Sequence, residues 1–206
     1  MILTIIVLSI LCLIPLALLH FGFLNCAFYF GILDIGLLVI CLVSVLHGSY
    51  RTIFLGHAPF VRSSKKIVAK ILENIRFEPK TKVYELGCGD ARFLRLLAKK
   101  QDVECVGYEY SLPPFLLAKF FNLFSHQKIS VYFRDFLKVN LSEANYIFCF
   151  LMPKEMELLE KKFINELKPG TMVISNTFTM KNWQPNKIID LEKRGFLSNK
   201  IYIYYR

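Results

Sequence analysis

The pattern of apolar and polar positions divides the chain into two regions. Residues 1–48 are almost continuously apolar, and Gly22 and Asn25 interrupt this run near its middle. A single helix of that length would be about 70 Å long at about 1.5 Å per residue, whereas the hydrocarbon core of a bilayer is only about 30 Å thick. The pattern therefore predicts a transmembrane hairpin of two helices, about 2–19 and 27–46.

From residue 49 onward the apolar runs are short and alternate between strand-like and helix-like spacing. The pattern predicts a linker and an extended lead-in segment over residues 49–64, and one domain over residues 65–206. Strands alternate with helices, which indicates an α/β fold with a parallel sheet closed by an antiparallel hairpin. Seven strands are predicted, at 83–86, 103–109, 129–133, 146–151, 172–178, 186–191 and 200–205.

The most informative stretch is 82–92, where a buried strand passes through a glycine turn into a helix predicted over 91–100. Gly87 and Gly89 let a ligand approach the backbone because they carry no side chain. The N–H groups of such a turn face whatever lies at the end of the strand. Arg92 stands where the dinucleotide fingerprint requires a small residue, so a dinucleotide site is disfavoured.

The row Glu85, Gly87, Gly89 and Ala91 resembles the first motif of the seven-strand S-adenosylmethionine (SAM) methyltransferases. SAM carries an amino acid end with an ammonium and a carboxylate. An acid at the strand tip attracts the ammonium, while the turn, including Cys88, and the start of the helix take the carboxylate.

Acidic residues also follow the next two predicted strands. Glu109 lies 20 residues after Gly89, and in a doubly wound sheet these two strand tips flank the same crevice. A carboxylate there can accept both ribose hydroxyls, and Tyr110 beside it is a further candidate for cofactor binding. Asp135 can accept the adenine amino group. Phe136 can pack on the adenine ring or can simply belong to the core.

A wider resemblance covers most of residues 58–185. The chain is similar to the small membrane-anchored protein-lysine methyltransferases that modify the ATP synthase c subunit and the adenine nucleotide translocase. The resemblance implies a seven-strand, Rossmann-like SAM-dependent fold and a segment near Phe60 that covers the site. Ala91 replaces a usual glycine, which is tolerable if that residue is already helical. The stretches that carry the resemblance are 58–61, 85–92, 106–109, 135–139, Pro153 with 159–162, and 183–185.

Candidates for the substrate pocket are Phe60, Met152, Pro153 and Trp183, and no single side chain is predicted to be catalytic. The fourth strand ends without the Asn/Asp-Pro-Pro-aromatic signature of enzymes that methylate nucleic-acid amino groups, so an adenine target is disfavoured. Cys149 lies in mid-strand with no evident base nearby, which favours a core thiol over a nucleophile.

The net charge and the spacing of the cysteines limit which classes of function fit the chain. Residues 51–206 hold all 26 Lys and Arg against 15 Asp and Glu, a net charge of +11. A basic face beside anionic lipid accounts for this excess, so no nucleic-acid partner is expected. The six cysteines form no CxxC pair, and we expect buried free thiols and no metal site. The positive-inside rule predicts a two-pass integral membrane protein with its domain on the cytoplasmic side or its organellar equivalent.

Taken together, these patterns predict a membrane-anchored, SAM-dependent methyltransferase. The resemblance implies that it methylates lysine side chains of a membrane protein close to the cytoplasmic surface. Two alternatives stay open. One is a methyltransferase for a lipid or quinone with the same anchor, and the other is a non-catalytic, membrane-tethered module that binds SAM.

Overall fold

The computed structural model describes residues 24–54, 65–125, 127–191 and 200–206. The chain divides into two compact units, 1–56 and 57–206, and each is described by itself below.

The described part of the first unit is helix α2, Leu24–Phe54. This helix begins before and ends after the predicted second crossing, 27–46. Most of its large apolar side chains between Tyr29 and Leu46 are exposed. Over the ranges that the structure describes, no helix combines the length and the apolarity of a membrane span, so the predicted transmembrane hairpin is not supported there. The first predicted crossing, 2–19, lies outside the described residues.

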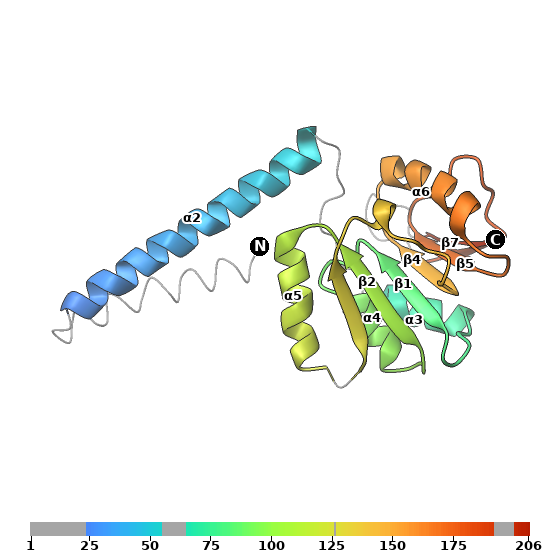
Figure 1. The fold of residues 1–206 in the computed structure, drawn as a ribbon, viewed down its shortest axis with the longest axis horizontal. Helices are drawn as coiled ribbons and strands as arrows, with labels where there is room; N and C mark the ends of the chain where they lie inside the picture. Colours follow the sequence, from blue (N-terminus) through green and yellow to red (C-terminus); the bar gives the residue numbers. More distant parts are fainter. Residues whose placement is uncertain (1–23, 55–64, 126, 192–199) are drawn as a thin grey trace. The chain divides into compact units, whose positions relative to one another are not determined.

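The second unit is built on a seven-stranded sheet in the order β3-β2-β1-β4-β5-β7-β6 (Figure 1). Its first five strands run parallel, and β7 pairs antiparallel with both β5 and β6. The predicted parallel sheet with a closing hairpin is therefore confirmed. The strands are β1 Lys82–Leu86, β2 Glu104–Glu109, β3 Ile129–Phe133, β4 Tyr146–Cys149, β5 Met172–Asn176, β6 Lys187–Asp190 and β7 Lys200–Tyr205.

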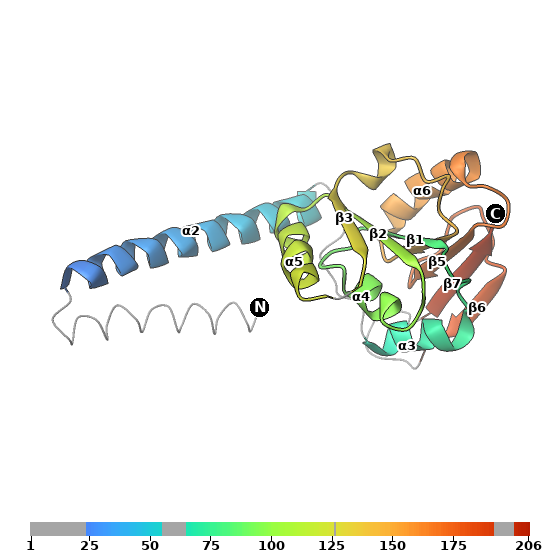
Figure 2. The same ribbon diagram turned by 60° about the horizontal axis from the view of Figure 1, so that its bottom comes forward.

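Helices cover both faces of this sheet because its strands are apolar on both sides. Helices α3, Lys65–Asn74, α4, Arg92–Ala98, and α5, Leu112–Leu123, lie on one face, and α6, Pro153–Glu166, lies on the other (Figure 2). Neighbouring strand residues point to opposite faces, so β1, β2, β4, β5 and β7 each supply both core clusters. The α3–α5 side includes Val83, Cys105, Phe148 and Ile174, and the α6 side includes Tyr84, Val106, Ile147 and Val173.

The start of α4 differs from the prediction. Helix α4 begins at Arg92, and Ala91 before it has a left-handed backbone with φ of 57°. The expectation that Ala91 is already helical is therefore wrong. The fully buried Ala91 occupies a conformation that favours glycine, at the position where the resemblance has glycine.

Replacing Ala91 with glycine should raise the free energy of unfolding by about 0.5–1 kcal/mol. A left-handed backbone costs an L-residue about 1–2 kcal/mol, and the greater freedom of glycine in the unfolded chain offsets about 0.4–1 kcal/mol of the gain. Urea unfolding measures the difference. Ala69→Gly, inside α3, is the matched control and should destabilise by about 1 kcal/mol. Equal destabilisation by both variants would show that Ala91 is not strained.

Candidate active site

The candidate site lies at the carboxyl ends of the parallel strands. Strand β1 occupies the middle of this edge, with β2 on one side and β4 on the other. The connection from β1 leads to β2, while β4 starts the opposite half of the sheet, so the strand order reverses beside β1. Ligands of open α/β sheets bind at such a switch point.

The turn after β1 is held against β2 by its own backbone. The N–H groups of Gly87 and Cys88 both donate to the Tyr108 carbonyl, at 2.9 and 3.0 Å. Gly87 and Gly89 have positive φ angles of 70° and 57°. A Cβ on Gly87 would also lie 2.9 Å from a methyl carbon of Leu151. The positive φ therefore favours glycine at Gly87, and a larger residue would also have to displace the Leu151 side chain.

Glu109 fixes both the glycine turn and the start of α5. Its Oε2 accepts a hydrogen bond from the Gly89 N–H at 2.8 Å, and its Oε1 accepts one from the Ser111 N–H at 2.7 Å. A carboxylate has about four lone-pair positions, so these two bonds leave acceptor capacity for a ligand. The structure thus places Glu109 beside the turn, as predicted, and adds a structural task that the sequence did not indicate.

Glu85 is a buried carboxylate that lacks a counterion at hydrogen-bonding distance among the described residues. Only 5% of its surface is exposed, and its Oε2 has no hydrogen-bond partner in that part of the chain. Burial, reinforced by the nearby Asp90 and Glu109 carboxylates, raises the pKa of Glu85 well above its ordinary value, while Arg95 opposes the shift. A cationic group of a ligand would satisfy this acceptor. The site therefore fits the ammonium end of SAM.

Asp90 and Arg95 brace the same turn, and the sequence analysis did not single them out. The buried Asp90 carboxylate lies 3.6 Å from the Arg95 guanidinium and accepts a hydrogen bond from the Arg92 N–H at 3.3 Å. Arg95 also donates to the Asn122 side chain of α5 at 3.1 Å. The available signal was a charge pair five residues apart across a helix start, which is weak without a structure.

Cys88 has a packing role. Its side chain is buried, and burial, followed by the Glu85 and Glu109 charges, raises the pKa of its thiol well above the ordinary value. Its sulfur occupies the space above Gly107, where a Cβ would lie only 2.7 Å away. Cys88 therefore cannot offer a thiolate to a ligand, and its backbone N–H already donates to the Tyr108 carbonyl.

Asp135 and Phe136 lie just beyond β3. Asp135 caps the short 3-10 helix η1, Phe136–Lys138, because its Oδ1 accepts a hydrogen bond from the Leu137 N–H at 2.9 Å. Phe136 is partly buried against the core cluster under α6. Tyr110 is exposed, and its ring stacks on Phe133 with the two planes 11° apart. The adenine role assigned to this group stays a prediction.

The predicted substrate-pocket residues do not form one group. Met152 is the exposed residue before α6, and Pro153 is the first residue of that helix. Trp183 packs on Tyr204, with ring centroids 5.2 Å apart, and lines a hollow of about 330 Å³ with Glu160, Ile164, Asn182, Tyr205 and Arg206. Phe60 lies outside the described residues.

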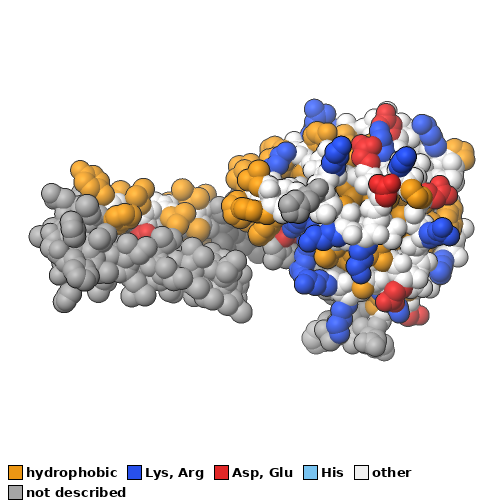
Figure 3. Space-filling view, turned by 90° about the horizontal axis from the view of Figure 1, so that it is seen from below, with side chains coloured by type: hydrophobic (Ala, Val, Ile, Leu, Met, Phe, Trp, Pro, Cys, Tyr) orange, Lys and Arg blue, Asp and Glu red, His pale blue; other side chains and the backbone are white. Residues whose placement is uncertain are grey.

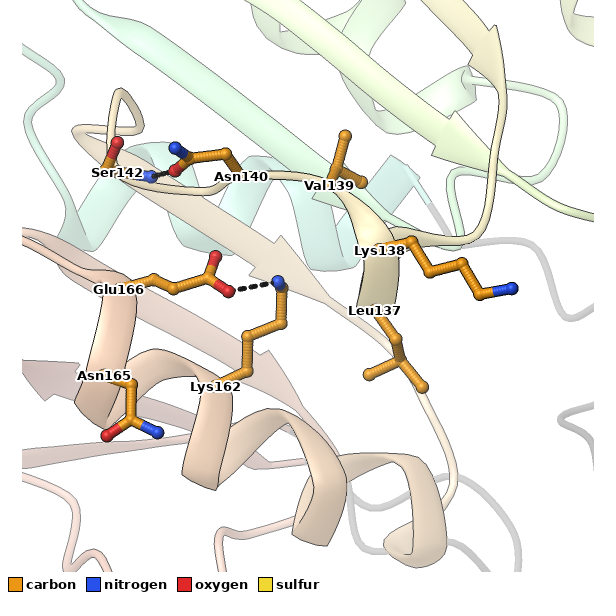
Figure 4. Close-up of a pocket in the computed structure, with 8 residues that line it drawn as sticks. All are labelled: Leu137, Lys138, Val139, Asn140, Ser142, Lys162, Asn165 and Glu166. Atoms are coloured by element: carbon orange, nitrogen blue, oxygen red, sulfur yellow. Dashed lines mark hydrogen bonds and ion pairs between the residues drawn. The ribbon is translucent and has the colours of Figure 1, made fainter.

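A larger hollow, of about 550 Å³, lies between η1 and α6 (Figure 4). In this view Lys162 extends toward Glu166, with which it forms an ion pair. Its lining consists of Leu137, Lys138, Val139, Asn140, Ser142, Lys162, Asn165 and Glu166. None of the predicted site residues belongs to this lining.

The carboxyl end of β5 carries two polar residues that the sequence analysis missed. Asn176 is 1% exposed, and its Nδ2 has no hydrogen-bond partner among the described residues. Thr177 follows it with φ of 75°, an unusual conformation for a β-branched residue. Cys149 on β4 is fully buried, and burial raises the pKa of its thiol to about 12, which confirms the core thiol.

This fold and this site define the class: the protein is a SAM-dependent methyltransferase. The family described as ANTKMT methyltransferase domain matches residues 85–187, which include the glycine turn and the strand-end acids. The chain belongs to this family.

Named relatives agree with the family. A protein-lysine N-methyltransferase of Saccharolobus islandicus is 32% identical over 73% of this chain and 95% of its own length. The adenine nucleotide translocase lysine N-methyltransferase of Mus musculus is 32% identical over 64% of this chain and 58% of its own length. The chain thus spans nearly all of the first relative and little more than half of the second.

A solved structure matches the same domain. It is described as an RNA methyltransferase from Salinibacter ruber in complex with S-adenosyl-L-homocysteine. It is 26% identical, covers 70% of this chain and 93% of its own, and superposes with a TM-score of 0.65. The bound S-adenosyl-L-homocysteine of that protein agrees with SAM as the cofactor of this one.

Proposed function

We propose that this protein is a membrane-anchored enzyme that methylates lysine side chains of a membrane protein. The observation that carries the proposal is the buried Glu85 carboxylate beside the glycine turn, whose Oε2 has no hydrogen-bond partner among the described residues, in a chain whose relatives include proteins named lysine N-methyltransferases. A relic that had lost its cofactor would not be expected to retain this costly group.

The residues around β1 and β2 would hold SAM. Glu85 would bind the ammonium. The turn of Gly87, Cys88 and Gly89 would lie beside the carboxylate without donating to it, because its three N–H groups already donate to the Tyr108 carbonyl and to Glu109. Glu109 would accept the ribose hydroxyls, and Asp135 the adenine amino group, with Phe136 or Tyr110 against the ring. When bound, SAM supplies a methyl group on a positively charged sulfur.

The chain's own contribution is alignment and exclusion of water. Methyl transfer needs the acceptor nitrogen in line with the methyl group, and correct placement alone lowers such barriers substantially. A lysine must lose its proton before it can attack. An apolar environment favours the neutral amine. The exposed Met152 and the adjoining Pro153 follow the carboxyl end of β4, where they can contact the side chain of an incoming substrate.

The proposed anchor and location rest on the first unit. Helix α2 exposes a long series of large apolar side chains, including Leu33, Ile40 and Leu46. Basic residues begin only at Arg51, which favours retention of the following domain on the cytoplasmic side, or its organellar equivalent. A domain that follows so closely can reach lysines near the membrane surface.

Methyl-labelled SAM tests the proposal in sealed, right-side-out vesicles that contain the full chain. Because SAM is charged, label should enter protein only after permeabilisation, and hydrolysis should release methylated lysine. Glu109→Ala should abolish most labelling, whereas Glu104→Gln, at the other end of β2, should not. Label that extracts with lipid would favour the lipid or quinone alternative, and label in nucleic acid would favour the activity named for the Salinibacter protein. Labelling without permeabilisation would reverse the orientation.

A further inference from the structure

Helix α5 is apolar on nearly its whole circumference. Between Leu112 and Leu123 its only polar or charged side chains are Lys119 and Asn122. One side of the helix is satisfied inside the domain, because Pro114 and Ala118 are buried and Phe115 packs against the core. The other side is exposed in the part of the chain that the structure describes, although a helix that is apolar all round is normally buried or in contact with lipid.

The outward side forms a continuous apolar ridge. Residues four apart on a helix lie above one another, and Leu112, Leu116, Phe120 and Phe124 form such a row. All four are exposed, and Leu123 beside them is exposed by 79%. Figure 3 shows apolar side chains gathered at this end of the domain, with Lys and Arg side chains next to them. An apolar patch of this kind marks an interaction surface.

The charges near the ridge indicate which partner it fits. From Tyr110 to Arg134 the chain contains no Asp or Glu, while Lys119, Lys128 and Arg134 are present and exposed. A second copy of this chain would bring the same cations against one another, which opposes self-association. An anionic lipid surface instead attracts cations and accepts apolar side chains.

We propose that the α5 ridge, defined as Leu112, Leu116, Phe120, Leu123 and Phe124, inserts into the surface of an anionic bilayer. The inference rests on the proposed function, because it needs the domain to work beside a membrane. It adds a second point of attachment on the catalytic domain itself. A domain attached through both α2 and the α5 ridge would keep one face toward the bilayer. Attachment through α2 and a linker alone would not fix this orientation.

Brominated lipids test the insertion with the full chain in vesicles that contain phosphatidylserine. Bromine on the acyl chains quenches only indoles that reach them, and the chain has a single native tryptophan, Trp183. Leu123→Trp adds an indole to the ridge. Leu158→Trp adds one at an exposed leucine on α6, on the opposite face of the sheet, and is the control.

We expect brominated chains to remove most of the emission added by Leu123→Trp and little of that added by Leu158→Trp. Adding Lys119→Glu to the first variant should reduce this quenching. Equal quenching of the two variants, or none at the ridge, would overturn the proposal, and circular dichroism checks that both remain folded. Lysine labelling that persists without ridge insertion would refute this inference alone, so the two failures are distinguishable.

Discussion

Glu109→Gln should weaken SAM binding about tenfold to a hundredfold. The ionised carboxylate holds the Gly89 and Ser111 N–H groups at 2.8 and 2.7 Å, and it is the predicted acceptor for the ribose hydroxyls. Hydrogen bonds to a charged group are each worth about 1.5–3 kcal/mol. The amide keeps one acceptor oxygen but turns an NH₂ toward a backbone N–H or a hydroxyl. Titration calorimetry with SAM measures the loss.

Thermal unfolding separates the two tasks of Glu109. Without ligand, Glu109→Gln should lower the melting temperature because two backbone anchors of the site are weakened. With SAM, the ligand-induced rise should also shrink, since a ligand at a hundred times its dissociation constant stabilises by about 2.7 kcal/mol. Glu104→Gln, exposed at the start of β2, is the matched control and should change neither quantity. Unchanged affinity in Glu109→Gln would remove this residue from the cofactor site.

The order of strands and helices in the domain was predictable because a strand that is buried on both faces appears in the sequence as a short apolar run. Strand β4, Tyr146–Cys149, is apolar and buried throughout, and Asn145 precedes it. The position of the site followed from topology, since Glu85 and Glu109 end neighbouring parallel strands. These relations depend on residue type and order alone.

The details of the site depend on distances that the sequence does not contain. Glu109 was predicted as a ligand acceptor, yet its two backbone hydrogen bonds arise only when the turn after β1 folds over the end of β2. The Asp90–Arg95 pair and the Asn176 Nδ2, which has no hydrogen-bond partner among the described residues, likewise come from tertiary placement. The backbone conformation of Ala91 was predicted wrongly because the spacing of apolar residues does not show at which residue the helix begins.

Glu85→Gln should remove a pH dependence of both stability and SAM binding. Burial and the neighbouring Asp90 and Glu109 carboxylates raise the pKa of Glu85 well above its ordinary value of 4.5, while the Arg95 guanidinium acts in the opposite direction. The folded protein therefore binds this proton more tightly than the unfolded chain does. The resulting stability is fully present below about pH 4.5 and is lost as the pH rises through the elevated pKa.

Bound SAM should lower the pKa of Glu85. An ammonium beside Glu85 favours the carboxylate, so SAM binding should release a proton and tighten as the pH rises through the same window. In Glu85→Gln the proton release should vanish. Affinity should fall at least tenfold at neutral pH, the size expected when a hydrogen bond to a charged group is lost. Without ligand, the variant should be at least as stable as the wild type at that pH, because the amide avoids the cost of ionising a buried carboxyl group.

Calorimetry in buffers of different ionisation enthalpy counts the protons released, and urea unfolding from below about pH 4.5 upward measures the stability. Glu104→Gln, with an exposed side chain, should leave both pH profiles as in the wild type. Equal proton release by wild type and Glu85→Gln would show that another group titrates on binding. A variant that binds SAM as well as the wild type would show that the buried carboxylate of β1 does not face the ammonium.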